Sequence, residues 1–283
     1  MVVTRFAPSP TGRLHLGHAY SALKVWHFTQ DTGGRFLLRI EDIDQGRCRP
    51  EFEAGIYEDL EWLGIEWETP VRRQSEHIDD YREALGRLDR MGLTYACFCT
   101  RKEIAAEIAA STSAPQGPAG PVYPGTCKAL STDQQTHMIE SGQAFSIRLD
   151  FEAARERVRE QNRWPLYWEE EATGAVEARP QDHGDVVLAR KDIPTSYHLA
   201  VTLDDDLQGV SHVIRGQDLA YSTHIHRLLQ SLLELETPLY RHHRLITDGK
   251  GRRLAKRDQS LTIASLREAG QTRQDVLRRF DEI

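Results

Sequence analysis

The chain has 283 residues, of which 39% are hydrophobic, so it is long enough to bury one large core or two smaller ones. Its 36 basic and 43 acidic residues give a net charge of −7, which argues against a general nucleic-acid-binding protein. No segment approaches the roughly 20 apolar residues of a membrane span, and the N-terminus has no signal-peptide pattern. Four cysteines, two of them too close for an easy mutual disulfide, favour a reducing compartment. We therefore expect a cytoplasmic protein without membrane contact.

The first predicted elements are a strand, a tight connection and a helix, which together favour a phosphate site. Residues 2–7 indicate a short buried strand, and a helix is expected after His18. The prolines and glycine of PSPTG make the connection between them tight and extended. Free backbone N–H groups and the helix dipole face an anion at such a place. His15 and His18 lie three residues apart on one side of it, where both can donate to phosphate oxygens. The alternative is a pair of surface histidines.

A second strand, 35–41, places an acidic residue beside the first strand. In an open parallel sheet, ligands bind beyond the carboxyl ends of the strands, where Arg5 and Glu41 both lie. An acidic residue there can hold an amino group, and an arginine can hold a carboxylate in a bidentate fork. The alternative for Glu41 is a solvated turn.

Two amphipathic helices are expected next. Pro50 opens the first, and Ser75 caps the second, which ends at Gly92. Their apolar stripes are typical of core packing rather than of a cofactor surface. These helices are interpreted as scaffold.

Three cysteines then mark a possible metal clip. Cys97 and Cys99 precede a helix that begins with a capping box at Thr100, and Cys127 follows a loop rich in small residues. Zinc prefers four ligands, and such a site would stiffen an insert with little core of its own. The alternative is three ordinary thiols. Cys48 is remote from them and is interpreted as a free thiol.

The middle of the chain carries fewer signals. A capped helix is expected over 131–142 and an alternating strand over 143–150. Residues 151–182 are polar and are interpreted as a surface insert without an assigned role. The sheet is expected to resume with 184–192, and an acidic turn is expected at 204–206. A strand over 213–216 ends at an arginine, before a helix that runs from 219 towards 233. Four histidines in the last third are interpreted as surface or packing residues: His224, His226, His242 and His243.

A basic loop, 249–258, follows a strand-like stretch at 243–247. Lys250 and Lys256 can close over a polyphosphate and neutralise charge on a leaving pyrophosphate. The alternative is a solvated charge run. Basic residues concentrated at 241–257 on an acidic body also suit a transient, salt-sensitive contact with tRNA.

PSPTG-x-LHLGH followed by RLAKR resembles the two signature motifs of class I aminoacyl-tRNA synthetases, in their glutamyl branch. Ala255 replaces the serine usual in the second motif but leaves Lys256 in place. The resemblance implies an α/β fold, the Rossmann-like nucleotide-binding fold of that class, with a central insertion carrying the zinc clip. It implies that ATP is bound by His15, Gly17, His18 and Lys256. Of these, the resemblance makes His15, His18 and Lys256 catalytic.

The same resemblance implies which residues bind the amino acid and which bind the metal. RFAPS at the start of the chain matches a glutamate-contacting segment, and SYHLAVTLDDDLQGV…VIRGQDL matches the second half of the family. The glutamate contacts implied are Arg5, Phe6, Ala7, Pro8, Ser9, Glu41, Tyr197 and Arg215. A Cys-x-Cys…Tyr-x3-Cys pattern in short glutamyl-type enzymes implies one structural Zn²⁺ held by Cys97, Cys99, Tyr123 and Cys127.

The expected organisation has four parts. The catalytic fold occupies 1–94 and 183–258, with an insertion at 95–182 between its halves and two short helices at 259–283. An anticodon-binding domain is not expected. In this organisation the chain resembles the short, stand-alone relatives of the glutamyl catalytic core. That likeness implies a monomer that activates L-glutamate with ATP and Mg²⁺ without tRNA. The likeness also implies that glutamate is then transferred to the queuosine base in the anticodon stem-loop of tRNA(Asp).

Three alternatives stay open at this point. The chain could charge the 3′ end of a tRNA, as a glutamyl-tRNA synthetase does. Another HxGH nucleotidylyltransferase would explain the first motif but neither the amino-acid pocket nor the basic loop. A non-catalytic synthetase paralogue usually loses the phosphate-contacting histidines and lysine, and all of them are present here.

Overall fold

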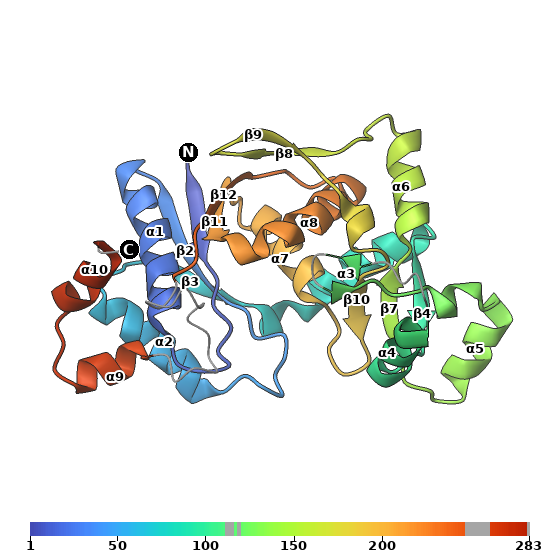
Figure 1. The fold of residues 1–283 in the computed structure, drawn as a ribbon, viewed down its shortest axis with the longest axis horizontal. Helices are drawn as coiled ribbons and strands as arrows, with labels where there is room; N and C mark the ends of the chain where they lie inside the picture. Colours follow the sequence, from blue (N-terminus) through green and yellow to red (C-terminus); the bar gives the residue numbers. More distant parts are fainter. Residues whose placement is uncertain (111–115, 118–119, 247–260, 282–283) are drawn as a thin grey trace.

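We describe a computed structural model of the chain, which covers residues 1–110, 116–117, 120–246 and 261–281 (Figure 1). The loop with Lys250 and Lys256 lies outside these residues. In the described part of the chain, no helix is both long enough and apolar enough to cross a bilayer.

Parallel strands form the centre of the molecule in two groups. The first group is ordered β1–β2–β3, and the second is β11–β12–β8 with β9 antiparallel at its edge. The two groups meet where the N–H of Ser211 donates to the carbonyl oxygen of Val3 (3.0 Å). The strands of these groups are β1 (Val3–Phe6), β2 (Arg35–Ile40), β3 (Glu68–Arg73), β8 (Tyr167–Glu170), β9 (Gly174–Glu177), β11 (His212–Gly216) and β12 (Leu239–His243).

Helices cover both faces of this arrangement, and strand alternation explains why. Successive side chains of a strand point to opposite faces, so Leu37 and Leu38 enter different cores, as do Val213 and Ile214. One face carries α3 (Ile78–Arg90), α7 (Tyr197–Leu207) and α8 (Ala220–Leu233), and the other carries α1 (Leu16–Asp31), α2 (Pro50–Trp62), α9 (Ile263–Glu268) and α10 (Arg273–Asp281) (Figure 1). The expected α/β fold with a parallel sheet is confirmed.

A separate antiparallel sheet, ordered β10–β7–β4, lies on the other side of the molecule with α4 to α6 (Figure 1). The expectation that 184–192 rejoins the parallel sheet is therefore wrong, because β10 pairs with β7. Alternation predicts a strand but does not specify its partner. The elements here are β4 (Thr94–Cys97), α4 (Arg101–Ala110), β5 (Gln116–Gly117), β6 (Gly120–Pro121), α5 (Thr132–Glu140), β7 (Ser146–Leu149), α6 (Phe151–Glu160) and β10 (Val187–Arg190).

Local capping signals were reliable at three helix starts. Pro50 is the first residue of α2, and the capping boxes at Thr100 and Ser131 are present. Ser75 is different: its N–H and hydroxyl both donate to the carboxylate of Asp42 (2.8 and 2.5 Å). The prediction that Ser75 caps the second helix is therefore wrong, and α3 begins at Ile78 after a short 3₁₀ turn.

Three further expectations need correction. Residues 204–206 are not a turn but part of α7, and Asp204 and Asp205 are buried there. The strand expected at 243–247 lies earlier, as β12. The segment 151–182 is not only a surface insert, because it forms α6, β8 and β9 and buries Leu166 and Trp168 in the core.

Candidate functional site

A cavity of about 690 Å³ opens at the carboxyl ends of β1, β2 and β11, where the two groups of parallel strands meet. The order of strands reverses at this point, which is where open α/β sheets bind their ligands. Eleven of the residues expected to contact glutamate or ATP line this one cavity: Arg5, Phe6, Ala7, Pro8, Ser9, His15, Gly17, His18, Glu41, Tyr197 and Arg215. Lys256 lies outside the described residues.

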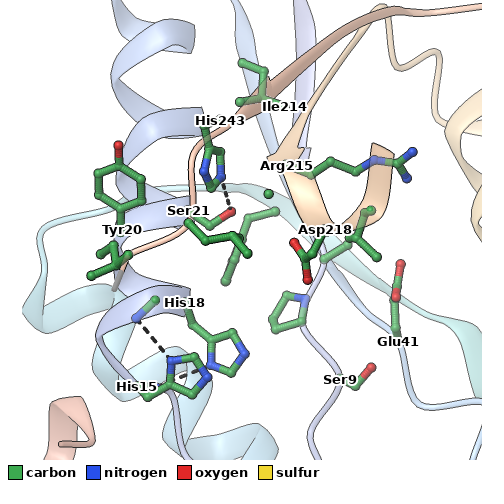
Figure 2. Close-up of a pocket in the computed structure, with 18 of the residues that line it drawn as sticks. Ser9, His15, His18, Tyr20, Ser21, Glu41, Ile214, Arg215, Asp218 and His243 are labelled. Carbon is green, nitrogen blue, oxygen red and sulfur yellow. Dashed lines mark hydrogen bonds between the residues drawn. The ribbon is translucent and has the colours of Figure 1, made fainter. Parts of the chain in front are cut away.

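The cavity has two ends of different chemistry. Figure 2 shows Ser9, Glu41 and Arg215 on one side, and His15 and His18 on the other, at the start of α1. We call the first the carboxylate end and the second the helix end.

At the carboxylate end, Arg5 is buried and ion-paired. Its Nε lies 3.0 Å from Oδ1 of Asp205, and the buried Arg39 approaches the same oxygen through Nη2 (2.5 Å). Burial alone would raise the pKa of Asp205, but Arg5 and Arg39 outweigh it and lower the pKa. Asp205 therefore stays ionised and neutralises part of the charge of two arginines.

Glu41 lies beside this group, and its carboxylate has only a distant cationic partner. Its Oε1 is 3.9 Å from Nε of Arg39. Burial raises the pKa of Glu41 to about 7, although Arg39 and Arg5 act in the opposite direction. Glu41 can therefore gain or lose a proton near neutral pH.

Arg215, at the end of β11, is held by neutral groups. Its Nη2 donates to the hydroxyl of Thr223 (2.7 Å) and its Nη1 to that of Tyr197 (3.3 Å). Its Nε donates to Nε2 of His242 (3.2 Å). Among the described residues, none of the ion pairs includes Arg215, so its charge is available to a ligand.

Two histidines near Arg215 pack in the interior, as the sequence interpretation allowed. His226 is buried, 3.4 Å from Nη1 of Arg215, and burial together with that charge lowers the pKa of His226 well below its usual range. His242 contacts the same arginine. Both are packed residues that also contact a residue of the cavity wall, and the sequence did not predict that contact. The usable signal was the position of His242 and His243 at a strand end, which was missed because β12 was placed too late.

At the helix end, two histidines shape the start of α1. Nδ1 of His15 accepts from the N–H of Gly17 (3.1 Å), and the rings of His15 and His18 stack with their centroids 3.7 Å apart. His243 also lines the cavity, and its Nε2 lies 3.1 Å from the hydroxyl oxygen of Ser21 (Figure 2). A helix start with imidazole rings around it suits an anionic ligand.

The cysteine cluster lies apart from the cavity, in the sheet of β4. The sulfur atoms of Cys97, Cys99 and Cys127 lie within 4.8 Å of one another. The hydroxyl oxygen of Tyr123 is 3.5 Å from the Cys99 sulfur and accepts from the N–H of Cys127 (3.0 Å). Three thiols this close together can supply three of the four ligands that a zinc ion prefers. Cys48 is not part of the cluster.

The chain is similar to known proteins over most of its length. The family model described as tRNA synthetases class I (E and Q), catalytic domain, matches residues 1–281. A protein of Rhodobacter capsulatus named glutamyl-Q tRNA(Asp) synthetase is 46% identical, over 98% of this chain and 99% of its own length. A protein of the same name from Nocardia farcinica is 40% identical, over 96% of this chain and 81% of its own length.

Solved structures show the same fold. A glutamate tRNA ligase from Elizabethkingia meningosepticum, in complex with its amino acid, superposes with a TM-score of 0.72 at 30% identity. The match covers 91% of this chain but only 52% of that ligase, so the chain spans about half of its length. Because the family model matches residues 1–281 and the Rhodobacter protein is matched over 99% of its length, the chain belongs to the class I tRNA synthetases of the E and Q group, within the glutamyl-Q tRNA(Asp) synthetase family.

Proposed function

We propose that the chain activates glutamate with ATP and transfers it to the queuosine base of tRNA(Asp). The observation that carries the amino-acid assignment is Arg215, a buried guanidinium at the cavity wall that none of the described carboxylates neutralises directly. The acceptor assignment rests on the full-length likeness to the Rhodobacter protein, whose name states it.

In the first step, an oxygen of the glutamate α-carboxylate attacks the α-phosphorus of ATP. The new P–O bond replaces the bond to the β-phosphate, and pyrophosphate leaves. Arg215 and Tyr197 hold the side-chain carboxylate, and Glu41 holds the ammonium group. Arg5, Ser9 and the Phe6–Pro8 backbone complete the wall around the amino acid. Positioning and charge, rather than a protein nucleophile, carry this step.

The helix end and Lys256 are assigned to ATP. In this proposal His15, Gly17 and His18 contact the phosphates. Lys256, which lies outside the described residues, supplies further positive charge. In the second step, a hydroxyl oxygen of queuosine attacks the carbonyl carbon of the adenylate, its proton is lost, and AMP leaves.

The test is ATP–pyrophosphate exchange with each amino acid in the absence of tRNA, followed by transfer of labelled glutamate to tRNA(Asp). We expect glutamate-dependent exchange and labelling only of tRNA that carries queuosine. Labelling of the 3′ end of tRNA(Glu) instead would show that the chain aminoacylates tRNA. That is the activity in the name of a 37%-identical Synechococcus protein, glutamate–tRNA ligase. Absence of exchange with every amino acid would overturn the proposal.

The role of His18 is tested in the same assay. His18→Ala removes a group assigned to the developing phosphate charge, so kcat should fall about 10²- to 10³-fold, with KM for glutamate nearly unchanged. His137→Ala, an exposed histidine of α5, is the matched control. Full exchange by His18→Ala would remove His18 from the mechanism.

We also infer that the cysteine cluster holds one structural zinc ion, with Cys97, Cys99, Cys127 and Tyr123 as ligands. The purified protein should contain about one zinc per chain. Cys127→Ser should lose the metal and unfold at lower urea concentration, whereas Cys48→Ser should do neither. Equal zinc content in both variants would contradict this assignment.

A further inference from the structure

A glutamate side chain from the β8–β9 hairpin reaches towards the substrate site through β12. Glu170 ends β8 and pairs with Tyr240 of β12. One of its carboxylate oxygens accepts from the N–H of His242 (2.9 Å), and the other lies 2.6 Å from Nδ1 of the same residue. The side chains of Glu170 and His242 are only 12% and 7% exposed. Such a short, buried contact between a carboxylate and an imidazole determines which ring nitrogen carries a proton.

The protons of His242 can be assigned from its two neighbours. An ionised carboxylate only accepts hydrogen bonds, so Nδ1 must carry the proton that faces Glu170. On the other side of the ring, Nε of Arg215 always carries a proton, so Nε2 of His242 must accept. Burial and the charge of Arg215 also lower the pKa of His242, although Glu170 opposes this. The ring is therefore neutral, with its lone pair directed at Arg215.

We propose that Glu170 and His242 are positioning residues that hold Arg215 in the orientation required to bind the side-chain carboxylate of the amino acid. The inference rests on the proposed function of Arg215. Neither residue needs to touch substrate. Glu170 sets the tautomer of His242, and His242 sets the direction of the guanidinium. Because His242 is neutral, the pair orients Arg215 without a direct carboxylate contact that would compete with the substrate.

An amide cannot replace the carboxylate of Glu170. Both of its partners, the backbone N–H and the Nδ1–H of His242, are donors, and a carboxylate accepts from both. A glutamine offers only one acceptor oxygen, and its NH₂ group would face the other donor. The alternative ring tautomer would relieve that conflict, but it would turn an N–H towards Arg215. The change of tautomer would release the guanidinium, and the unrelieved conflict would displace the ring that holds it.

The decisive experiment compares Glu170→Gln with Glu171→Gln in glutamate-dependent ATP–pyrophosphate exchange. Glu171 is the next residue in the chain, carries the same charge and pairs with Arg241 at the surface (2.9 Å), away from Arg215. We expect Glu170→Gln to raise KM for glutamate about 10- to 100-fold, since a hydrogen bond to a charged group is affected. KM for ATP and kcat should change less than twofold, because uniform binding is lost. Glu171→Gln should resemble the unsubstituted protein.

A second pair of variants separates positioning from folding. His242→Gln still offers an acceptor to Nε of Arg215, whereas His242→Leu does not. The glutamine variant should keep KM for glutamate closer to that of the unsubstituted protein than the leucine variant does. The preference for glutamate over glutamine should narrow in the leucine variant, because Arg215 is then free to turn away.

Three results would overturn the inference. KM for glutamate could be equal in Glu170→Gln and Glu171→Gln. The glutamine and leucine variants of His242 could be equally impaired. KM for ATP could rise with KM for glutamate, as expected of a general structural defect. If the unsubstituted protein shows no glutamate-dependent exchange, the proposed function itself fails, and that result is separate from these three.

Discussion

Arg5 and Arg215 approach the same end of the cavity from the two groups of parallel strands, and each is 5% exposed. Arg5 shares Asp205 with Arg39, so three charged groups form one buried cluster. Arg215 is surrounded by hydroxyl and imidazole groups instead.

The different surroundings of Arg5 and Arg215 suit them to different functions. A buried arginine that is paired with a carboxylate has its desolvation compensated within the protein, so it stabilises one geometry. A buried arginine held by neutral acceptors keeps most of its electrostatic attraction for a ligand. We therefore propose that Arg5, paired with Asp205, mainly stabilises the shape of the cavity, whereas Arg215 binds the substrate carboxylate.

The largest expected effect comes from Asp205→Asn. The substitution leaves Arg5 and Arg39 without their closest carboxylate while preserving shape. The free energy of unfolding in urea should fall by about 3–5 kcal/mol, as when one member of a buried ion pair is removed. Asp192→Asn is the control, because the side chain of Asp192 is 76% exposed. Equal stability of the two variants would contradict the stabilising role of the Arg5–Asp205–Arg39 cluster.

Arg215→Ala should affect activity more than stability. The fall in its kcat/KM for glutamate should correspond to a loss of about 2–5 kcal/mol of transition-state stabilisation, the range for truncating one partner of a buried charge pair. Its unfolding free energy should fall less than that of Asp205→Asn, because the neighbours left behind are neutral. Exchange kinetics and urea unfolding measure the two quantities, with Arg157→Ala, on α6 and half-exposed, as the control. A stability loss without a change in KM would reverse the roles proposed for the two arginines.

The pKa of Glu41, raised to about 7, predicts a pH dependence of glutamate binding. As pH rises through 7, Glu41 loses its proton and gains the charge that attracts an ammonium group. KM for glutamate should therefore be level above pH 7 and rise about tenfold per unit below it. Glu41→Gln should bind glutamate weakly at all pH values and lose this dependence. A level profile in the unsubstituted protein would exclude Glu41 as the ammonium ligand.

The smallest effect is expected from an exposed pair. Arg35 and Glu68 form a bidentate contact (2.6 and 2.9 Å), as close as the pairing of Arg5 with Asp205, but their side chains are 47% and 41% exposed. Glu68→Gln should cost less than about 1 kcal/mol of unfolding free energy. A loss as large as that of Asp205→Asn would mean that pairing geometry, rather than burial, distinguishes the two sides of the cavity.

Much of the helix end could be predicted because its signals are local. The strand, the tight PSPTG connection and the helix that follows lie within one short stretch, and His15 does mark the start of α1. The position of Arg215 was also predictable, since it follows from a strand end before a helix. The neighbourhood of Arg215 was not predictable. Glu170 lies 72 residues from His242, and the roles of both depend on which strands pair.

The acidic residues of α7 show the same limit. Three consecutive aspartates suggest a solvated turn, because isolated carboxylates are costly to bury. Asp204 and Asp205 are buried only because arginines distant in the chain, Arg5, Arg39 and Arg72, meet them there. No local pattern carries that information.

By itself, the sequence determined the element order around the first motif and the chemical types at the strand ends, since these follow from short-range periodicity and capping. Its two signature motifs indicated the α/β class through their resemblance to a known family. Only the tertiary structure decided that a carboxylate neutralises Arg5 but not Arg215, and which histidine contacts Arg215. The physical reason is that burial and charge compensation act through space, between groups that the chain brings together only after its sheets have formed.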